Sequence, residues 1–211
     1  MKSRLPTRTR GRPRAFDVDQ ALDQAMRVFW KHGYEGTSLT DLTRAMGINR
    51  PSLYAAFGNK EALFRRALDR YAQGPAEYIR AALNEPSARG VFERLLSSAV
   101  SLLTDPRHPP GCLMVQGALS CAADADPVRC ELAARRTAGE VAIRQRFEKA
   151  RANGDLPPDV TPADLARYVT TIMHGMAVRA AGGASRRELS TIAQVALRAW
   201  PTSTIRGQPG P

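Results

Sequence analysis

The sequence predicts an all-α protein with an N-terminal three-helix helix-turn-helix unit and a C-terminal helical domain, about nine helices in all. Apolar residues recur three and four positions apart along most of the 211-residue chain, as they do on one face of a helix. No segment alternates apolar and polar residues in the manner of a half-buried strand. Gly and Pro residues divide this pattern into separate helices.

The first helix is expected over about 17 residues after Asp17. Leu22, Met26 and Phe29 fall on one face of it, with Trp30 beside them. The Asp17 carboxylate can accept hydrogen bonds from the unpaired amides of the first turn. Gly33 can end the helix.

Two short helices follow, at about Ser38–Met46 and Arg50–Phe57. Ser38 and Asp41 have the spacing of a capping box, with Asp in place of Glu. Gly47 breaks the chain between the two helices, and Asn49 can cap the second. Neither helix is long enough to be stable alone, so we expect the two helices to function as a pair.

The remaining helices are separated by Pro and Gly. A helix over Lys60–Gln73 can be capped by Asn59 and ends at Gly74-Pro75. The later helices are expected over about 76–84, 87–104, 111–123, 127–153, 162–181 and 186–200.

Positive charge is concentrated at the N-terminus. The chain has 31 Lys and Arg against 20 Asp and Glu, a formal net charge of +11. A basic arm ahead of a folded unit favours binding to nucleic acid, and a solubilising tail is the alternative. Residues 1–16 contain no acidic residue and six basic ones, namely Lys2, Arg4, Arg8, Arg10, Arg12 and Arg14.

The pair of short helices resembles a DNA-reading hairpin, in which the second helix enters the major groove. Arg50 can form a bidentate contact with guanine, and Lys60 adds charge at the start of the next helix. An ordinary helical hairpin with solvated polar faces is the alternative. The polar side chains expected to face DNA are Thr40, Arg44, Asn49, Arg50, Ser52 and Tyr54.

Residues 15–70 closely resemble the N-terminal domain of TetR-family transcriptional regulators. Pro51 stands where the family more often has a small residue, which affects the expected base preference. The resemblance is carried by Gly11-Arg12-Pro13-Arg14, Phe29-x-x-x-Gly33-Tyr34-Glu35-Gly36-Thr37-Ser38, Leu42-Thr43-Arg44-Ala45-Met46-Gly47-Ile48 and Leu53-Tyr54-x-x-Phe57-Gly58-Asn59-Lys60-Glu61-Ala62-Leu63.

The resemblance implies a homodimeric DNA-binding regulator, most often a repressor that a small molecule releases from its operator. Two recognition helices related by a two-fold axis require a near-palindromic operator. Tyr54, Lys60 and Thr40 match positions that usually touch phosphates, and Arg12 and Arg14 would lie near the minor groove. The implied divisions are a basic arm (1–14), a DNA-binding domain (15–60), a helical ligand-binding and dimerisation domain (61–200) and a disordered tail (201–211).

The last two helices carry apolar stripes that could form a four-helix bundle with a second copy. The alternative is that both stripes face the core of their own chain. The candidate interface residues are Leu165, Val169, Ile172, Leu189, Ile192, Ala196 and Trp200. A pocket for a small apolar inducer could be lined by Phe92, Leu102, Met114, Phe147, Tyr168, Ile172, Met173 and Met176.

Three cysteines, Cys112, Cys121 and Cys130, show no disulfide or metal spacing. Cys112 follows His108-Pro109-Pro110-Gly111 and opens a helix, where its thiolate would be stabilised. A thiol-, electrophile- or metal-responsive regulator using Cys112, with or without His108, is therefore an alternative, and an inert buried thiol is the plainer one.

The sequence argues against several other classes of protein. Nucleophile-elbow, zinc-protease, phosphate-loop and dinucleotide-binding motifs are all missing, so we expect neither an enzyme nor a cofactor. A secretory signal and a long apolar segment are missing too, so a cytoplasmic location is expected. An architectural protein that binds DNA without sequence preference stays open.

Overall fold

The computed structural model describes residues 16–117 and 126–201. The predicted basic arm with Arg12 and Arg14, and Cys121, lie outside these residues. Ten helices occupy the described part of the chain, against the nine predicted when the short 76–84 piece is not counted separately. They are α1 (Val18–His32), α2 (Leu39–Met46), α3 (Arg50–Phe57), α4 (Lys60–Gln73), α5 (Tyr78–Ala82), α6 (Ala88–Leu103), α7 (Leu113–Gln116), α8 (Asp126–Ala152), α9 (Pro162–Ala181) and α10 (Arg186–Arg198).

The predicted boundaries of α3 and α4 agree with the structure, because each helix starts and stops at a strong local signal. The Asn49 side chain accepts a hydrogen bond from the Ser52 amide at 2.9 Å, and Asn59 accepts one from the Ala62 amide at 2.8 Å. Ser38 and Asp41 form the predicted capping box of α2. Gly47 ends α2 with φ of +65°, a conformation that favours glycine.

The segment predicted as one helix over 111–123 is the part that differs most. Only the four-residue helix α7 lies within its described portion, which ends at Gly117. Gly111 has φ of +90°, so the helix cannot begin there. Cys112 instead occupies the cap position of α7.

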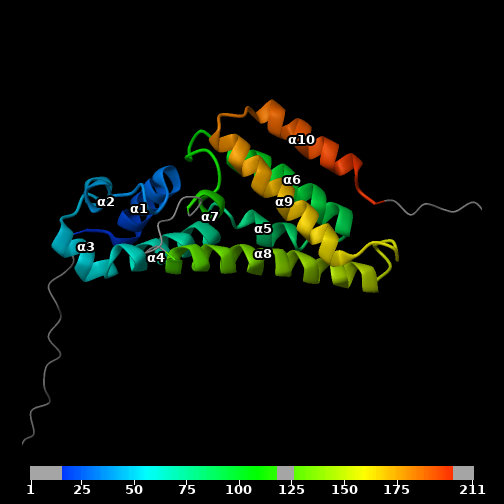
Figure 1. Cartoon of the computed structure of the whole chain (residues 1–211), viewed down its shortest axis with the longest axis horizontal. Coiled ribbons are helices and arrows are strands. Elements are labelled where there is room, and N and C mark those ends of the chain that lie inside the picture. Colours follow the sequence, from blue (N-terminus) through cyan, green and yellow to red (C-terminus); the bar gives the residue numbers. More distant parts are fainter. Residues whose placement is uncertain (1–15, 118–125, 202–211) are drawn as a thin grey trace, which may run out of the picture.

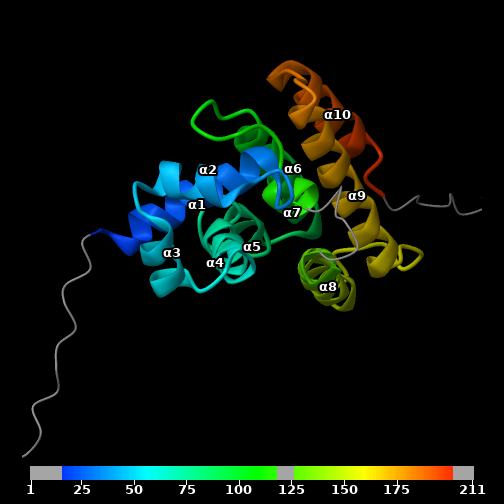
Figure 2. The same ribbon diagram turned by 60° about the vertical axis from the view of Figure 1, so that its left-hand side comes forward.

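The helices form an N-terminal unit and a larger helical body (Figure 1). α1, α2 and α3 lie at one end of the molecule, and α4 leads from them toward the body. The long helix α8 packs along α9, and α10 packs on α6 and α9. In Figure 2, α8 is seen nearly end-on, with α4 and α5 to one side of it and α9 to the other.

Two apolar cores correspond to these two parts. The first joins α1 to α4 and includes Phe29, Trp30, Phe64 and Tyr71, all of which are fully or almost fully buried. It continues along α4 to Tyr71, well past residue 60, and it also takes in Leu113 of α7. The second core is built from α6, α8, α9 and α10. Helices α7 and α8 contribute side chains to both cores and so connect the two parts.

Within the described residues, no helix combines the length and the apolar character needed to cross a membrane.

Candidate nucleic-acid interface and internal cavity

The helix α3 presents one apolar and one polar face. Leu53 and Phe57 are buried against the first core. On the other side, Arg50 is exposed and the Tyr54 side chain is 48% exposed. An exposed tyrosine and arginine on a short helix that projects from the body are suited to contacting a phosphate backbone and base edges.

Arg50 is held by a partner on the preceding helix. Its Nη2 donates a hydrogen bond to the Thr40 Oγ1 at 3.2 Å, which joins α2 to α3. Arg44 is exposed on the last turn of α2. Asn49 is exposed, and its side-chain oxygen caps α3. The structure thus joins Thr40 to Arg50 and leaves Arg44, Asn49 and Tyr54 exposed.

Lys60 has a more enclosed environment than the sequence indicates. Its Nζ lies 4.4 Å from the centre of the Tyr34 ring, a cation–π contact. Burial lowers the pKa of Lys60, and the charge of Glu35 opposes this shift. The ammonium group is therefore fixed by the turn after α1 at the N-terminus of α4.

Arg66 supports the other end of α3, and sequence reasoning missed it. Its Nη1 donates to the Ala56 carbonyl at 3.1 Å, and its guanidinium lies 4.7 Å from the centre of the Phe57 ring. Arg70 similarly ties α4 to α1 through two hydrogen bonds to Asp23, at 2.7 and 3.0 Å. The basic residues of α4 therefore hold the helix-turn-helix in place.

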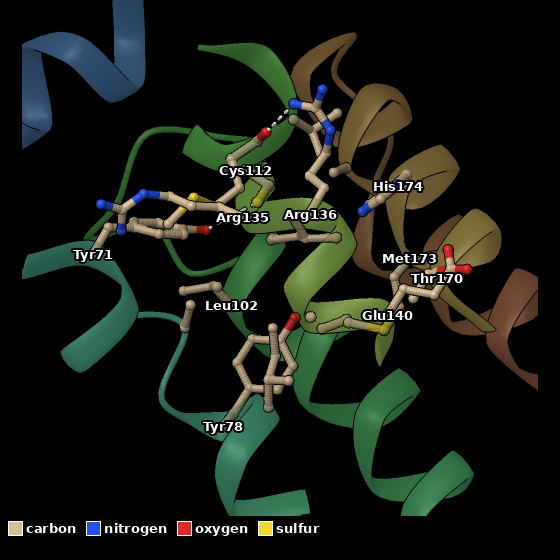
Figure 3. Close-up of a pocket in the computed structure, with 18 of the residues that line it drawn as sticks. Tyr71, Tyr78, Leu102, Cys112, Arg135, Arg136, Glu140, Thr170, Met173 and His174 are labelled. Carbon is tan, nitrogen blue, oxygen red and sulfur yellow. Dashed lines mark hydrogen bonds between the residues drawn. The ribbon is translucent and has the colours of Figure 1, made fainter. Parts of the chain in front are cut away.

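A cavity of about 100 Å³ lies between α4, α5, α6, α7, α8 and α9 (Figure 3). Leu102, Met114 and Met173 line it, as predicted for an inducer pocket. Sequence reasoning missed most of its polar lining, since helical periodicity identifies a buried face but not a void in it. The missed polar residues are Tyr71, Tyr78, Arg135, Arg136, Glu140, Thr170 and His174.

The other five predicted pocket residues lie elsewhere. Phe92 and Phe147 are fully buried and pack against Trp200. Tyr168 stacks on Phe92 from the surface. Ile172 and Met176 pack into the second core.

Tyr71 connects the cavity with the first core. Its hydroxyl donates to the Cys112 Sγ at 3.3 Å, and its ring meets the Trp30 ring edge-on, with 4.7 Å between centroids. Burial raises the pKa of Tyr71 well above its usual value, so the phenol stays protonated. One side chain therefore touches both the void and the centre of the DNA-binding unit.

Cys112 lines the cavity as a thiol rather than as a stabilised thiolate. Burial raises the pKa of Cys112. The hydrogen bond from Tyr71 and the amides of Met114 and Val115 act in the opposite direction, but more weakly. The prediction of a thiolate at a helix start is thus wrong, because the loss of solvation outweighs the favourable amides of a one-turn helix.

His108 lies against the first core. Its imidazole stacks on the Trp30 ring, with 5.3 Å between centroids, and its Nε2 is 4.0 Å from the Asp105 carboxylate. Burial lowers the pKa of His108. Within residues 16–117 and 126–201, no three His, Cys, Asp or Glu side chains gather in a way that could hold a metal ion.

The apolar stripes of the last two helices, predicted as a dimer interface, pack within their own chain. Leu165, Val169, Leu189 and Ala196 are buried in the second core, which is the intramolecular alternative. Ile172, Ile192 and Trp200 are partly buried against the same core. The large apolar side chains that α9 and α10 expose are instead Tyr168, Val178 and Val195, of which Val195 is 58% exposed.

The two halves of the chain match two family models. Residues 21–67 match the model described as bacterial regulatory proteins, tetR family. Residues 91–195 match the model of the tetracyclin repressor-like C-terminal domain. The first range covers most of the helix-turn-helix unit, and the second covers most of the helical body.

Individual proteins are similar over almost the whole length. The transcriptional repressor ComR of Escherichia coli K12 is 38% identical over 196 residues, or 92% of this chain and 93% of that protein. The repressor BdcR of the same organism is 28% identical over 205 residues, or 96% of this chain and 98% of that protein.

A solved structure shows the same fold in a DNA complex. It is a cysteine mutant of the TetR-family regulator CifR, complexed with 26-bp double-strand operator DNA. That protein is 44% identical to this chain, with a TM-score of 0.87, and the match covers 90% of this chain and 100% of the other. The chain therefore belongs to the TetR family and is a DNA-binding transcriptional regulator.

Proposed function

We propose that the protein is a homodimeric repressor that binds a near-palindromic operator and leaves it when a small molecule occupies the internal cavity. The similarity to CifR, which is complexed with operator DNA, carries the DNA-binding part of this proposal. The names of ComR and BdcR support repression. We place the protein in the cytoplasm with the operator, and we assign it no catalytic role.

The DNA-reading surface comprises the polar faces of α2 and α3. Arg50, oriented by Thr40, contacts a base edge in the major groove. Tyr54, Lys60, Thr40 and Arg44 contact phosphates around it, and the arm with Arg12 and Arg14 adds charge in the minor groove.

The dimer interface is the outer face of α9 and α10. Tyr168, Val178 and Val195 expose apolar surface there, and a second copy would cover it. Two-fold symmetry would place the two α3 helices about 34 Å apart, one turn of DNA.

Release from the operator follows from the contacts that α4 and α7 make between the cavity and the helix-turn-helix unit. A ligand against Tyr71 presses on Trp30 through a direct ring contact. The carbonyl of Gly117, directly after α7, also accepts a hydrogen bond from the Tyr34 amide, at 3.2 Å, in the turn between α1 and α2. Movement of α4 or α7 would therefore change the orientation of α3.

Cys112 supports a second candidate function, a response to thiol-modifying compounds. The observation in its favour is that Cys112 lines the same cavity and accepts a hydrogen bond from the Tyr71 hydroxyl. Replacement by Ser tests it. If an oxidant or electrophile releases wild-type protein from DNA but not Cys112→Ser, the signal is covalent. Release of both proteins would exclude Cys112 as the sensor.

Selection of DNA from a random pool at about physiological salt tests the proposed repressor. We expect an enriched near-palindrome with half-sites one helical turn apart. Enrichment of no sequence, by reduced and refolded protein, would favour the architectural alternative instead.

A further inference from the structure

We propose that the cavity takes an uncharged molecule of about four to six non-hydrogen atoms, mainly hydrocarbon, whose single oxygen accepts a hydrogen bond from Tyr78. This inference rests on the proposed function only in taking the cavity as the effector site. It goes further by specifying the size, charge and polar group of the ligand.

The size follows from the volume. An apolar cavity of about 150 Å³ holds a molecule as large as benzene. The cavity here, at about 100 Å³, is smaller. Apolar side chains form much of its wall, including Leu102, Ile143 and Met173, so most of the ligand surface must be hydrocarbon.

The absence of ligand charge follows from the charges around the cavity, which have both signs within the described residues. Arg135 is paired with Asp69 and Glu131, each at 2.7 Å. Arg136 and Glu140 contribute one charge of each sign. An ion of either sign entering this space would lose its water and meet a like charge, on Arg136 or on Glu140.

Arg136 and Glu140 each have an uncharged hydrogen-bond partner, and His174 adds no charge. Arg136 donates to the Met114 carbonyl at 2.9 Å, and Glu140 accepts from the Thr170 hydroxyl at 3.3 Å. Burial, together with the charge of Arg136, lowers the pKa of His174 and keeps its imidazole neutral. Around neutral pH the wall and the two carboxylates paired with Arg135 therefore hold two cations and three anions, with both signs facing the cavity.

Tyr78 provides the hydrogen bond. Figure 3 shows its hydroxyl pointing into the cavity from α5, and in the described structure this hydroxyl has no hydrogen-bond partner. By contrast, the Tyr71 hydroxyl already donates to Cys112. Burial raises the pKa of Tyr78, so its proton stays available for donation. A ligand oxygen in the cavity can accept this proton in place of water.

Tyr78 also lies where a ligand can enter. Tyr78 and Leu102 line both the cavity and a surface groove that continues along Ser97 and Ser101 of α6. A small neutral molecule can therefore reach the cavity past the phenol that would bind it.

Three probes with the same five-atom branched skeleton separate these requirements: butan-2-one, 2-methylbut-1-ene and propionate. Saturation-transfer NMR on the full chain without DNA measures their dissociation constants. We expect butan-2-one to bind most tightly and propionate about tenfold more weakly or not at all. The Tyr78→Phe variant should lose about two- to tenfold in affinity for butan-2-one. Its affinity for 2-methylbut-1-ene should not change, which also shows that the cavity is intact.

Thr171→Val removes an exposed hydroxyl outside the cavity and is the matched control, with all three affinities expected to be unchanged. Equal binding of propionate and butan-2-one, equal losses for butan-2-one and the alkene in Tyr78→Phe, or no saturable binding of butan-2-one would each overturn the inference. Operator affinity, measured separately, distinguishes the two proposals. Tyr78-dependent binding of butan-2-one without DNA release would leave the ligand class standing and reject the effector role of the cavity. If a ligand of another chemical class binds the cavity and releases the protein from DNA, the effector role of the cavity stands and the proposed ligand class is rejected.

Discussion

Arg50 is the residue on which sequence-specific reading of DNA depends most in this account. Its guanidinium is exposed and oriented by Thr40. We expect Arg50→Ala to reduce discrimination between operator and random DNA by about 1–3 kcal/mol. Thr40→Val should have a smaller effect, since it removes only the orienting hydroxyl. Fluorescence anisotropy gives the dissociation constants of each variant for operator and for random DNA. An equal loss of affinity for both DNAs would show that Arg50 reads no base.

Cys112 provides a test of the cavity environment. Since burial raises its pKa, its thiolate fraction stays below that of an ordinary cysteine until the pH rises above the usual thiol range. We expect iodoacetamide to alkylate Cys112 more slowly than the exposed Cys130 at pH 7, and the difference to narrow as the pH rises. Peptide mass spectrometry gives both rates. Faster alkylation of Cys112 at pH 7 would indicate a stabilised thiolate and favour the thiol-sensing alternative.

At the scale of elements, the capping box of α2 matters to DNA binding as well as to stability. Ser38→Ala removes the hydrogen bond to the Asp41 amide and should lower the free energy of unfolding by about 1 kcal/mol. Ser185→Ala breaks the equivalent box of α10 and is the matched control. Urea unfolding should show similar losses in the two variants, but only Ser38→Ala should weaken operator binding. Weakened binding in both would attribute the effect to general stability.

Arg66 is expected to keep α3 in place from behind. Arg66→Met removes its bond to the Ala56 carbonyl but retains much of the side-chain length. We expect operator affinity to fall about two- to tenfold. Arg65→Met is the control, since Arg65 pairs with Glu61 on the exposed side of α4. If the two variants bind operator equally well, Arg66 has no positioning role.

The sequence predicts the helices far better than it predicts the cavity. Asn49, Asn59 and Ser38 each cap an amide three residues further along the chain, so local spacing is enough to place α2, α3 and α4. The cavity brings Tyr71 of α4 together with Cys112, separated by 41 residues. Helical periodicity carries no information about such a pairing.

At the scale of the whole molecule, the assembly depends on the outer face of α9 and α10. Val195→Asp places a charge in the proposed interface without disturbing the core, because Val195 is exposed. We expect sedimentation to show monomers and operator affinity to fall sharply. Ser97→Asp, at an exposed position of α6, should remain dimeric. A dimer of unchanged stability in Val195→Asp would place the interface elsewhere.

The most direct test of a two-fold dimer that reads DNA by sequence uses the selected operator and a copy with one half-site scrambled. The two DNAs have the same length and charge, so phosphate contacts are equal. We predict that scrambling one half-site weakens binding by at least about a hundredfold, since the bases read by one α3 helix are lost. Equal affinity for the two DNAs would contradict the account, because binding would then depend on one half-site or on charge alone.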